Sequence, residues 1–112
     1  FMENHVHFSK GKCIEIQGGG VSLSELLEKT AGGGVILVGD AARQIDSITG
    51  GGVANACLSG EIAGRIIGNA TETKDYSKEA MQEYDMEWRK VMEDRLYHSY
   101  LAKTKLTEVE PE

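Results

Sequence analysis

The sequence predicts an α/β fold that is only part of a domain: an N-terminal β-hairpin, one buried strand, a glycine-led helix and a long C-terminal amphipathic helix. Three observations predict it. Apolar residues alternate near the start, a compact β-branched run stands at 35–38, and apolar residues recur at helical spacing in the last third. With 112 residues, the chain is one domain at most. Because Phe1 precedes Met2, we expect it to be a fragment of a longer protein.

The hairpin is expected over residues 5–17. Val6 and Phe8 alternate with polar residues before a polar turn at 9–12, and Ile14 and Ile16 alternate after it. Alternation of this kind is typical of a strand with one buried face.

A short helix and a strand are expected next. Ser22 and Glu25 have the spacing of a capping box, which predicts a helix that ends near Lys29. Val35–Val38 is apolar at every position, which is typical of a strand that is buried on both faces.

The glycine-led helix is expected to begin at Gly50–Gly52 and to end near Asn69. Small residues recur on it every fourth position, so we expect another segment of backbone to approach this stripe closely. The stripe consists of Gly52, Ala56, Gly60, Gly64 and Gly68.

The C-terminal helix is expected over residues 75–106, and an acidic flexible tail over 107–112. Its apolar stripe is more typical of an ordinary core than of a grip on a lipid chain. The stripe includes Met81, Tyr84, Trp88, Val91, Met92, Leu96 and Tyr100.

Charge and composition exclude some functions. A net charge of −6 has the wrong sign for a nucleic-acid binder that works by counterion release. The sequence contains no membrane span and no signal-peptide pattern, so we expect a cytoplasmic protein. Cys13 and Cys57 are expected to be free thiols. His5, His7 and Cys13 could imitate a metal site, but no fourth ligand is evident, and we expect no metal.

The stretch from Gly39 to Asn55 has the chemistry of a ligand crevice. A carboxylate, Asp40, follows a strand and precedes a helix whose first turn is glycine. Free amides and the helix dipole at such a place favour an anion or an electron-rich ring. The alternative is a tight strand-to-helix turn with no ligand. The dinucleotide pattern GxGxxG is absent here, so the chain would supply only one side of a nucleotide site.

The segment Val35–Gly68, VILVGDAARQIDSITGGGVANACLSGEIAGRIIG, resembles the second FAD-binding motif of p-hydroxybenzoate-hydroxylase-like flavoproteins. Its GDAARQ, TGGG and SGxxAG elements are most similar to the archaeal geranylgeranyl reductase family, the digeranylgeranylglycerophospholipid reductases. Many relatives have proline at the position of Ser47, and the hydroxylases have histidine at that of Arg43. The arginine favours the reductase branch.

The resemblance implies the C-terminal part of an FAD-dependent oxidoreductase, with a partial FAD/NAD(P)-binding-type fold. Asp40 would hydrogen-bond the ribityl or adjoining phosphate region of FAD. The start of the glycine-led helix would direct its amides to the pyrimidine edge of the flavin. The implied cofactor-binding residues are Gly39, Asp40, Gly50, Gly51, Gly52 and Val53. No catalytic residue is assigned.

The implied reaction is the saturation of isoprenoid C=C bonds of archaeal-type geranylgeranyl lipids. The implied substrate is therefore an isoprenoid lipid, the electron donor is left open, and peripheral contact with the membrane and dimerisation through exposed strand edges remain open. Two alternatives also remain: a hydroxylase-like or quinone-reducing flavoprotein, and a non-catalytic, stand-alone binding module.

Overall fold

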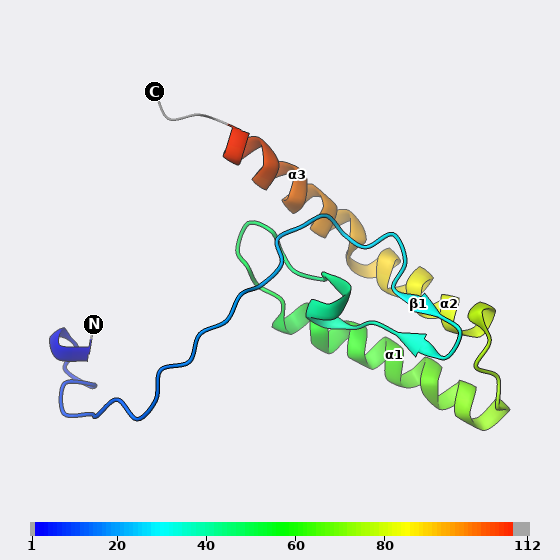
Figure 1. Cartoon of the computed structure of the whole chain (residues 1–112), viewed down its shortest axis with the longest axis horizontal. Helices are drawn as coiled ribbons and strands as arrows, with labels where there is room; N and C mark the ends of the chain where they lie inside the picture. The colour runs from blue at the N-terminus through cyan, green and yellow to red at the C-terminus, as the bar shows by residue number, and fades with distance from the viewer. Residues whose placement is uncertain (1, 109–112) are drawn as a thin grey trace.

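A computed structural model describes residues 2–108 (Figure 1). An extended N-terminal segment leads into a short β-hairpin and a turn, which lie against a pair of packed helices. In chain order the elements are η1 (Met2–Asn4), β1 (Ala31–Gly32), β2 (Val35–Ile36), η2 (Gly39–Ala42), α1 (Val53–Thr73), α2 (Lys78–Trp88), the π-helical turn η3 (Arg89–Glu93) and α3 (Asp94–Glu108). The predicted α/β class is confirmed, and so are the glycine-led helix and the long C-terminal helix.

The core lies between α1 and the C-terminal helices. A left-handed residue, Lys74, ends α1, and the Ser77 hydroxyl caps α2 by accepting a hydrogen bond from the Ala80 amide at 3.3 Å. The chain therefore reverses within a few residues, and α2 packs back along α1. The buried side chains at this contact are Ala63, Ile66, Ala70, Met81, Tyr84, Trp88, Met92 and Leu96. Most of the predicted stripe is thus ordinary core, whereas Val91 is 58% exposed and Tyr100 lies outside the core cluster.

The π-helical turn keeps this stripe on one face. Tyr84, Trp88, Met92 and Leu96 are spaced by four, and in an α-helix of 3.6 residues per turn each such step advances the side chain by roughly 40°. The wider i→i+5 turn of η3 rotates less per residue and offsets this drift. Met92 and Leu96 are consequently both about 1% exposed.

The sheet is a single short hairpin, whose second strand lies within the predicted strand at 35–38. β1 and β2 pair antiparallel, with Ala31 opposite Ile36 and Gly32 opposite Val35. Gly34, at φ 71°, allows the tight turn between them. Both strands pack against α2, but Val35 is 57% exposed. The prediction of a strand buried on both faces at 35–38 is therefore wrong within this chain, because no further strand flanks β2 in the described residues.

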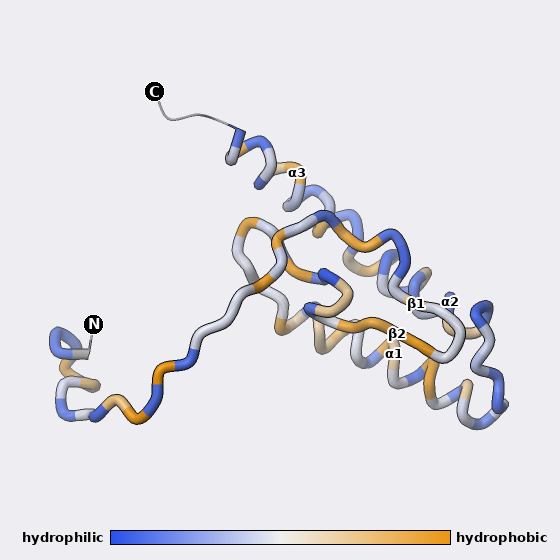
Figure 2. Tube along the Cα trace, viewed as in Figure 1, coloured by the Kyte–Doolittle hydropathy of each residue, from blue (hydrophilic) through white to orange (hydrophobic). Residues whose placement is uncertain are grey.

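The predictions for the first thirty residues are also wrong. Residues 5–17 contain turns and extended chain rather than a β-hairpin, and residues 22–29 are not helical. Figure 2 shows apolar positions along this segment where it stands away from the helices. Ile14 is 98% exposed and Ile16 89% exposed. Alternation stabilises a strand only if something covers its apolar face, and no described residue does so.

Two further expectations change. The face of α1 that packs on α2 carries Ser59, Ala63 and Ile66, whereas a Cβ at Gly60 or Gly64 would have no neighbour within 4 Å. Only the start of the small-residue stripe is closely approached. α3 continues to Glu108, so the first two residues of the expected tail are helical, and 109–112 lie outside the described residues. None of the described helices is both long enough and apolar enough to span a membrane.

Candidate functional site at the start of the glycine-led helix

The turn Gly39–Ala42 lies directly against the first residues of α1. Gly39 has a left-handed φ of +63°, and a Cβ on it would lie 3.2 Å from the Cβ of Ala56. Only glycine provides both this conformation and this closeness. Gly39 therefore shapes the turn. Its amide is not available to a ligand, because it already donates to the Gln44 side chain at 2.8 Å.

The Asp40 side chain extends from this turn toward the N-terminal end of α1. Gly52 is the N-cap of the helix, and a Cβ on Gly52 would lie 3.3 Å from Oδ1 of Asp40. The Asp40 side chain is exposed, and within the described residues its carboxylate has no hydrogen-bond donor. Two residues twelve positions apart in the sequence thus place a carboxylate and a helix N-terminus side by side.

The first turn of α1 offers unused donors. The Gly50 amide donates to the Asp46 carbonyl at 2.8 Å, and the Gly51 amide to the Thr49 hydroxyl at 3.1 Å. By contrast, no acceptor within residues 2–108 pairs with the amides of Gly52 and Val53. Helix N-termini leave such groups open to ligands. Of the predicted cofactor-binding residues, Gly52 and Val53 therefore have free donors, whereas Gly50 and Gly51 form the loop.

A pocket of about 520 Å³ opens at this helix end. The loop residues line it together with the first turn of α1 and one residue from α3, Arg95. Arg95 donates to Oδ1 of Asn55 at 2.7 Å, and its remaining nitrogens have no acceptor in the described part of the chain. A guanidinium therefore faces the same space as the helix N-terminus, and both favour negative charge.

Asp46 closes the loop in front of this pocket. Its carboxylate accepts hydrogen bonds from the amides of Ile48 and Thr49 and from the hydroxyl of Ser99 on α3. The hydrogen bond from the Thr49 backbone, together with the others, outweighs burial and lowers the pKa of Asp46 below its ordinary value. This carboxylate is thus engaged in fixing the loop and in tying it to α3.

A chain of hydrogen-bonded side chains, three of them buried, connects the turn with all three long helices. Gln44 is fully buried, with an exposed fraction of 0%. Its neighbour Arg43, half-buried, donates to the Glu25 carbonyl at 3.3 Å. Asn55 is 4% exposed and donates to the Gln44 carbonyl at 2.9 Å. Asn55, a polar residue on the packed face of α1, was the one sign of this network in the sequence. Nothing in the sequence connected Arg95 with Asn55.

A second polar cluster holds the β-hairpin to α2. The carboxylate of Asp85 accepts hydrogen bonds from the amide and the hydroxyl of Thr30, and the Trp88 indole donates to that hydroxyl at 2.7 Å. Burial raises the pKa of Asp85, but the hydrogen bonds from Thr30 and Arg89 and the charge of Arg89 outweigh it and hold the pKa below 3.8. The cluster is structural and lies away from the start of α1.

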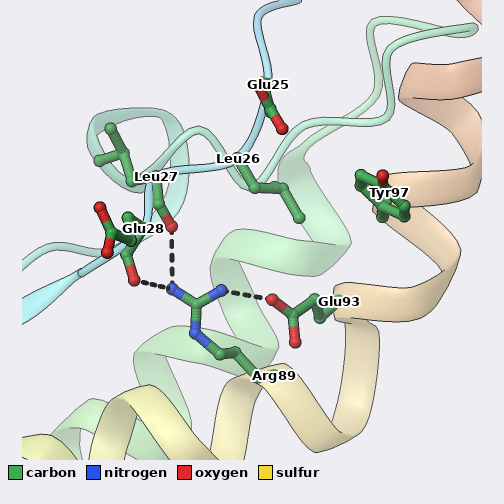
Figure 3. A pocket seen from close by; sticks show the side chains of 7 residues that line it. All are labelled: Glu25, Leu26, Leu27, Glu28, Arg89, Glu93 and Tyr97. Carbon is green, nitrogen blue, oxygen red and sulfur yellow. Dashed lines mark hydrogen bonds and ion pairs between the residues drawn. The ribbon is translucent and has the colours of Figure 1, made fainter.

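A pocket of about 630 Å³ beside Arg89 is larger, but its arginine is engaged by the protein itself (Figure 3). The guanidinium binds the carboxylates of Asp85 and Glu93 and the carbonyls of Leu27 and Glu28. With its nitrogens engaged in this way, Arg89 anchors the segment before β1. The described residues contain no group of three or more metal-binding side chains.

Comparisons with known proteins agree on one family. The chain is 43% identical over 106 residues to the digeranylgeranylglycerophospholipid reductase of Thermoplasma acidophilum, covering 95% of this chain and 27% of that protein. It is 41% identical to the Thermoplasma volcanium reductase of the same name, over all of this chain and 28% of that protein. The corresponding protein of Methanocella arvoryzae is 43% identical over 102 residues. No family model matches the chain.

The fold agrees with a solved relative. A crystal structure of a geranylgeranyl bacteriochlorophyll reductase-like protein from Thermoplasma acidophilum superposes with a TM-score of 0.79 at 41% identity. The match covers 97% of this chain and 28% of that chain. The chain thus spans about a quarter of the length of the relatives it matches. On both sequence and fold, it belongs to the geranylgeranyl reductase family, as a part of such a protein.

Proposed function

We propose that the chain forms one side of the flavin site of an FAD-dependent oxidoreductase that saturates isoprenoid C=C bonds of archaeal-type geranylgeranyl lipids. The observation that carries the proposal is the juxtaposition of Asp40 with the first turn of α1, whose Gly52 and Val53 amides have no protein acceptor in the described residues. Family membership supports it, because the relatives are named as reductases of a geranylgeranyl lipid.

The residues present fit the chemistry of a flavin. Ribityl hydroxyls are donors, and the unpaired carboxylate of Asp40 is an acceptor that could hold them. The pyrimidine edge of a flavin bears acceptors at N1 and O2, which free backbone amides complement. The glycine at position 52 lets a ligand approach the backbone, because a Cβ there would already crowd Asp40 at 3.3 Å.

The electrostatics also suit a flavin. Bound reduced FAD would supply the hydride, and the reduced ring carries negative charge at N1 and O2. The dipole of α1 and its fixed amides stabilise negative charge at that point without reorganisation. Arg95 adds a full positive charge to the same pocket. Asp40, which is near Gly52 but does not line this pocket, binds hydroxyls and not the anionic edge. The role of this chain is therefore to bind and tune the cofactor.

The proposed substrate is an isoprenoid lipid, and the apolar grip for it is expected outside this chain. The buried stripe of the C-terminal helices is occupied by packing against α1 and offers no channel. The electron donor remains open, as does any contact with the membrane surface.

An FAD titration of the chain tests the cofactor assignment. Asp40→Ala is compared with Glu72→Ala, which removes an exposed carboxylate at the C-terminal end of α1, far from the proposed site. Flavin fluorescence reports binding, and circular dichroism verifies that both variants remain folded. We expect weak FAD binding by the unmutated chain, because it supplies only one side of the site, a clear loss in Asp40→Ala and no change in Glu72→Ala. Equal affinity of the two variants contradicts the role of Asp40.

The reaction is tested in a longer protein that joins this chain to a GxGxxG unit. We expect its reduced flavin to be reoxidised anaerobically by a geranylgeranyl lipid, with saturation of the lipid detected by mass spectrometry. Reoxidation that requires oxygen and an aromatic substrate would instead identify a hydroxylase. Flavin binding without either reaction would leave a binding module.

A further inference from the structure

We propose that Gln44 is a positioning residue for the flavin site: through a buried hydrogen-bond relay to Tyr84 and Asn55, it holds the turn that carries Asp40 against the start of α1. This inference rests on the proposed function and deepens it. It ties the geometry of the cofactor site to the C-terminal helices, which themselves do not reach Asp40.

The relay begins on α2. The Tyr84 hydroxyl donates to the Leu37 carbonyl at 2.8 Å and accepts from Nε2 of Gln44 at 3.1 Å. Both side chains are fully buried, with an exposed fraction of 0%. Burial raises the pKa of Tyr84, while the hydrogen bond from Gln44 acts in the opposite direction. The phenol therefore stays protonated at ordinary pH and remains a donor to the chain just before the turn.

Gln44 then connects to the turn at two points. Its side-chain Oε1 accepts from the Gly39 amide at 2.8 Å, and its backbone N–H donates to the Gly39 carbonyl at 3.1 Å. The polar groups on both sides of Gly39 are thus engaged by one residue. Asp40 follows directly, so its backbone position depends on where Gln44 holds Gly39.

The other end of the relay lies on α1 and α3. The backbone carbonyl of Gln44 accepts from Nδ2 of Asn55, which is 4% exposed. Oδ1 of Asn55 in turn accepts from the Arg95 guanidinium. Asn55 belongs to the first turn of α1, the same turn that offers the free amides. One continuous set of hydrogen bonds therefore sets the turn, the helix start and the guanidinium in the pocket.

Packing alone does not require this arrangement. A buried amide is costly unless it is satisfied, and an apolar side chain of the same length would fill the space. Satisfied polar networks differ from apolar packing in fixing one geometry. The placement of a buried glutamine whose Oε1 and Nε2 both have protein partners, between the carboxylate turn and the helix start, points to positioning.

The test compares Gln44→Met and Tyr84→Phe with Thr30→Val in the complete 112-residue chain. Thr30→Val is the matched control, because Thr30 is 1% exposed and its hydroxyl also hydrogen-bonds a buried aromatic on α2. Urea unfolding gives each variant's stability, amide NMR spectra without ligand report the turn, and FAD titration gives affinity. We expect Gln44→Met to shift the Gly39 and Asp40 amides and to weaken FAD binding by about tenfold, which is the scale of one lost buried hydrogen bond.

Tyr84→Phe should shift the same amides less, and Thr30→Val should leave them and the FAD affinity unchanged at a comparable loss of stability. Gln44→Met with unaltered Gly39 and Asp40 amides, or with an affinity loss no greater than that of Thr30→Val, overturns the proposal. If the unmutated chain shows no response to FAD, the proposed function fails instead, and the spectra of the ligand-free variants still decide whether the relay holds the turn.

Discussion

Replacing Gly39 by alanine tests the close contact between the turn and α1. Gly39 has φ +63°, and a left-handed conformation costs a residue with a Cβ about 1–2 kcal/mol. The added Cβ would meet the Cβ of Ala56 at 3.2 Å, and overpacking of this kind costs about 1–3 kcal/mol. The lower entropy of the unfolded alanine chain returns roughly 0.4–1 kcal/mol. We therefore expect Gly39→Ala to lower the free energy of unfolding by about 1–4.5 kcal/mol.

Gly60→Ala is the matched control, because it makes the same chemical change in the middle of α1. A Cβ at Gly60 has no neighbour within 4 Å, and alanine is favoured over glycine inside a helix by about 1 kcal/mol. The two variants should therefore shift the urea midpoint in opposite directions, with unchanged m values. The midpoint is followed by circular dichroism and by the fluorescence of Trp88. A Gly39→Ala variant as stable as the unmutated chain would refute the tight contact between turn and helix.

Three further outcomes are expected. Thr30→Val should lower the free energy of unfolding by about 1–3 kcal/mol, since it removes a buried hydroxyl that bonds both Trp88 and Asp85. The indole then keeps only its longer contact with Asp85, at 3.2 Å, so a changed tryptophan emission should accompany the loss; an unaltered emission would contradict the hydrogen bond. The pKa of Asp85 is lowered in the folded state, so its contribution to stability is present above about pH 4 and is lost as the pH falls further. Asp85→Asn should therefore make the free energy of unfolding depend less on pH in this acid range, and an unchanged dependence would mean that other groups cause it. Met92→Ala should cost about 2–4 kcal/mol, and Val91→Ala, at a neighbouring exposed position, less than about 0.5 kcal/mol in the same thermal or urea assay; equal costs would contradict the burial of Met92 against α1.

The helices were predictable because their signals are local. Four-residue spacing from Tyr84 to Leu96, a glycine-led start and a serine cap at position 77 each specify helix without help from distant residues. The π-helical turn was not predicted, although the strict spacing of four from Tyr84 to Leu96 is a signal for it. Helix starts and apolar stripes are fixed within a few turns of chain.

The strand predictions were wrong in part because strands depend on residues that are distant in the sequence. Ile14 and Ile16 need partners that this chain does not supply among its described residues. The hairpin forms instead at 31–36, where α2 gives it a surface, although Val35 stays 57% exposed. Strand formation depends on packing against neighbours more than on the strand's own residues.

The candidate site was predicted in part. The sequence singled out Asp40 and the glycines at 50–52, and the structure brings Asp40 and Gly52 together. Arg95 comes from a helix forty residues away, and Gln44 is recognisable only once its burial is known. Assignment of these residues to a cofactor stays a prediction.

The most direct test of the central claim is an amide NMR titration of the complete chain with FAD, extended to several millimolar ligand. The flavin site proposed here predicts saturable shifts at Asp40, Gly52, Val53 and the Asn55 side chain, reproduced by FMN and not by ADP. Shifts confined to the surroundings of Arg89, or no saturable shift at the start of α1, would contradict it.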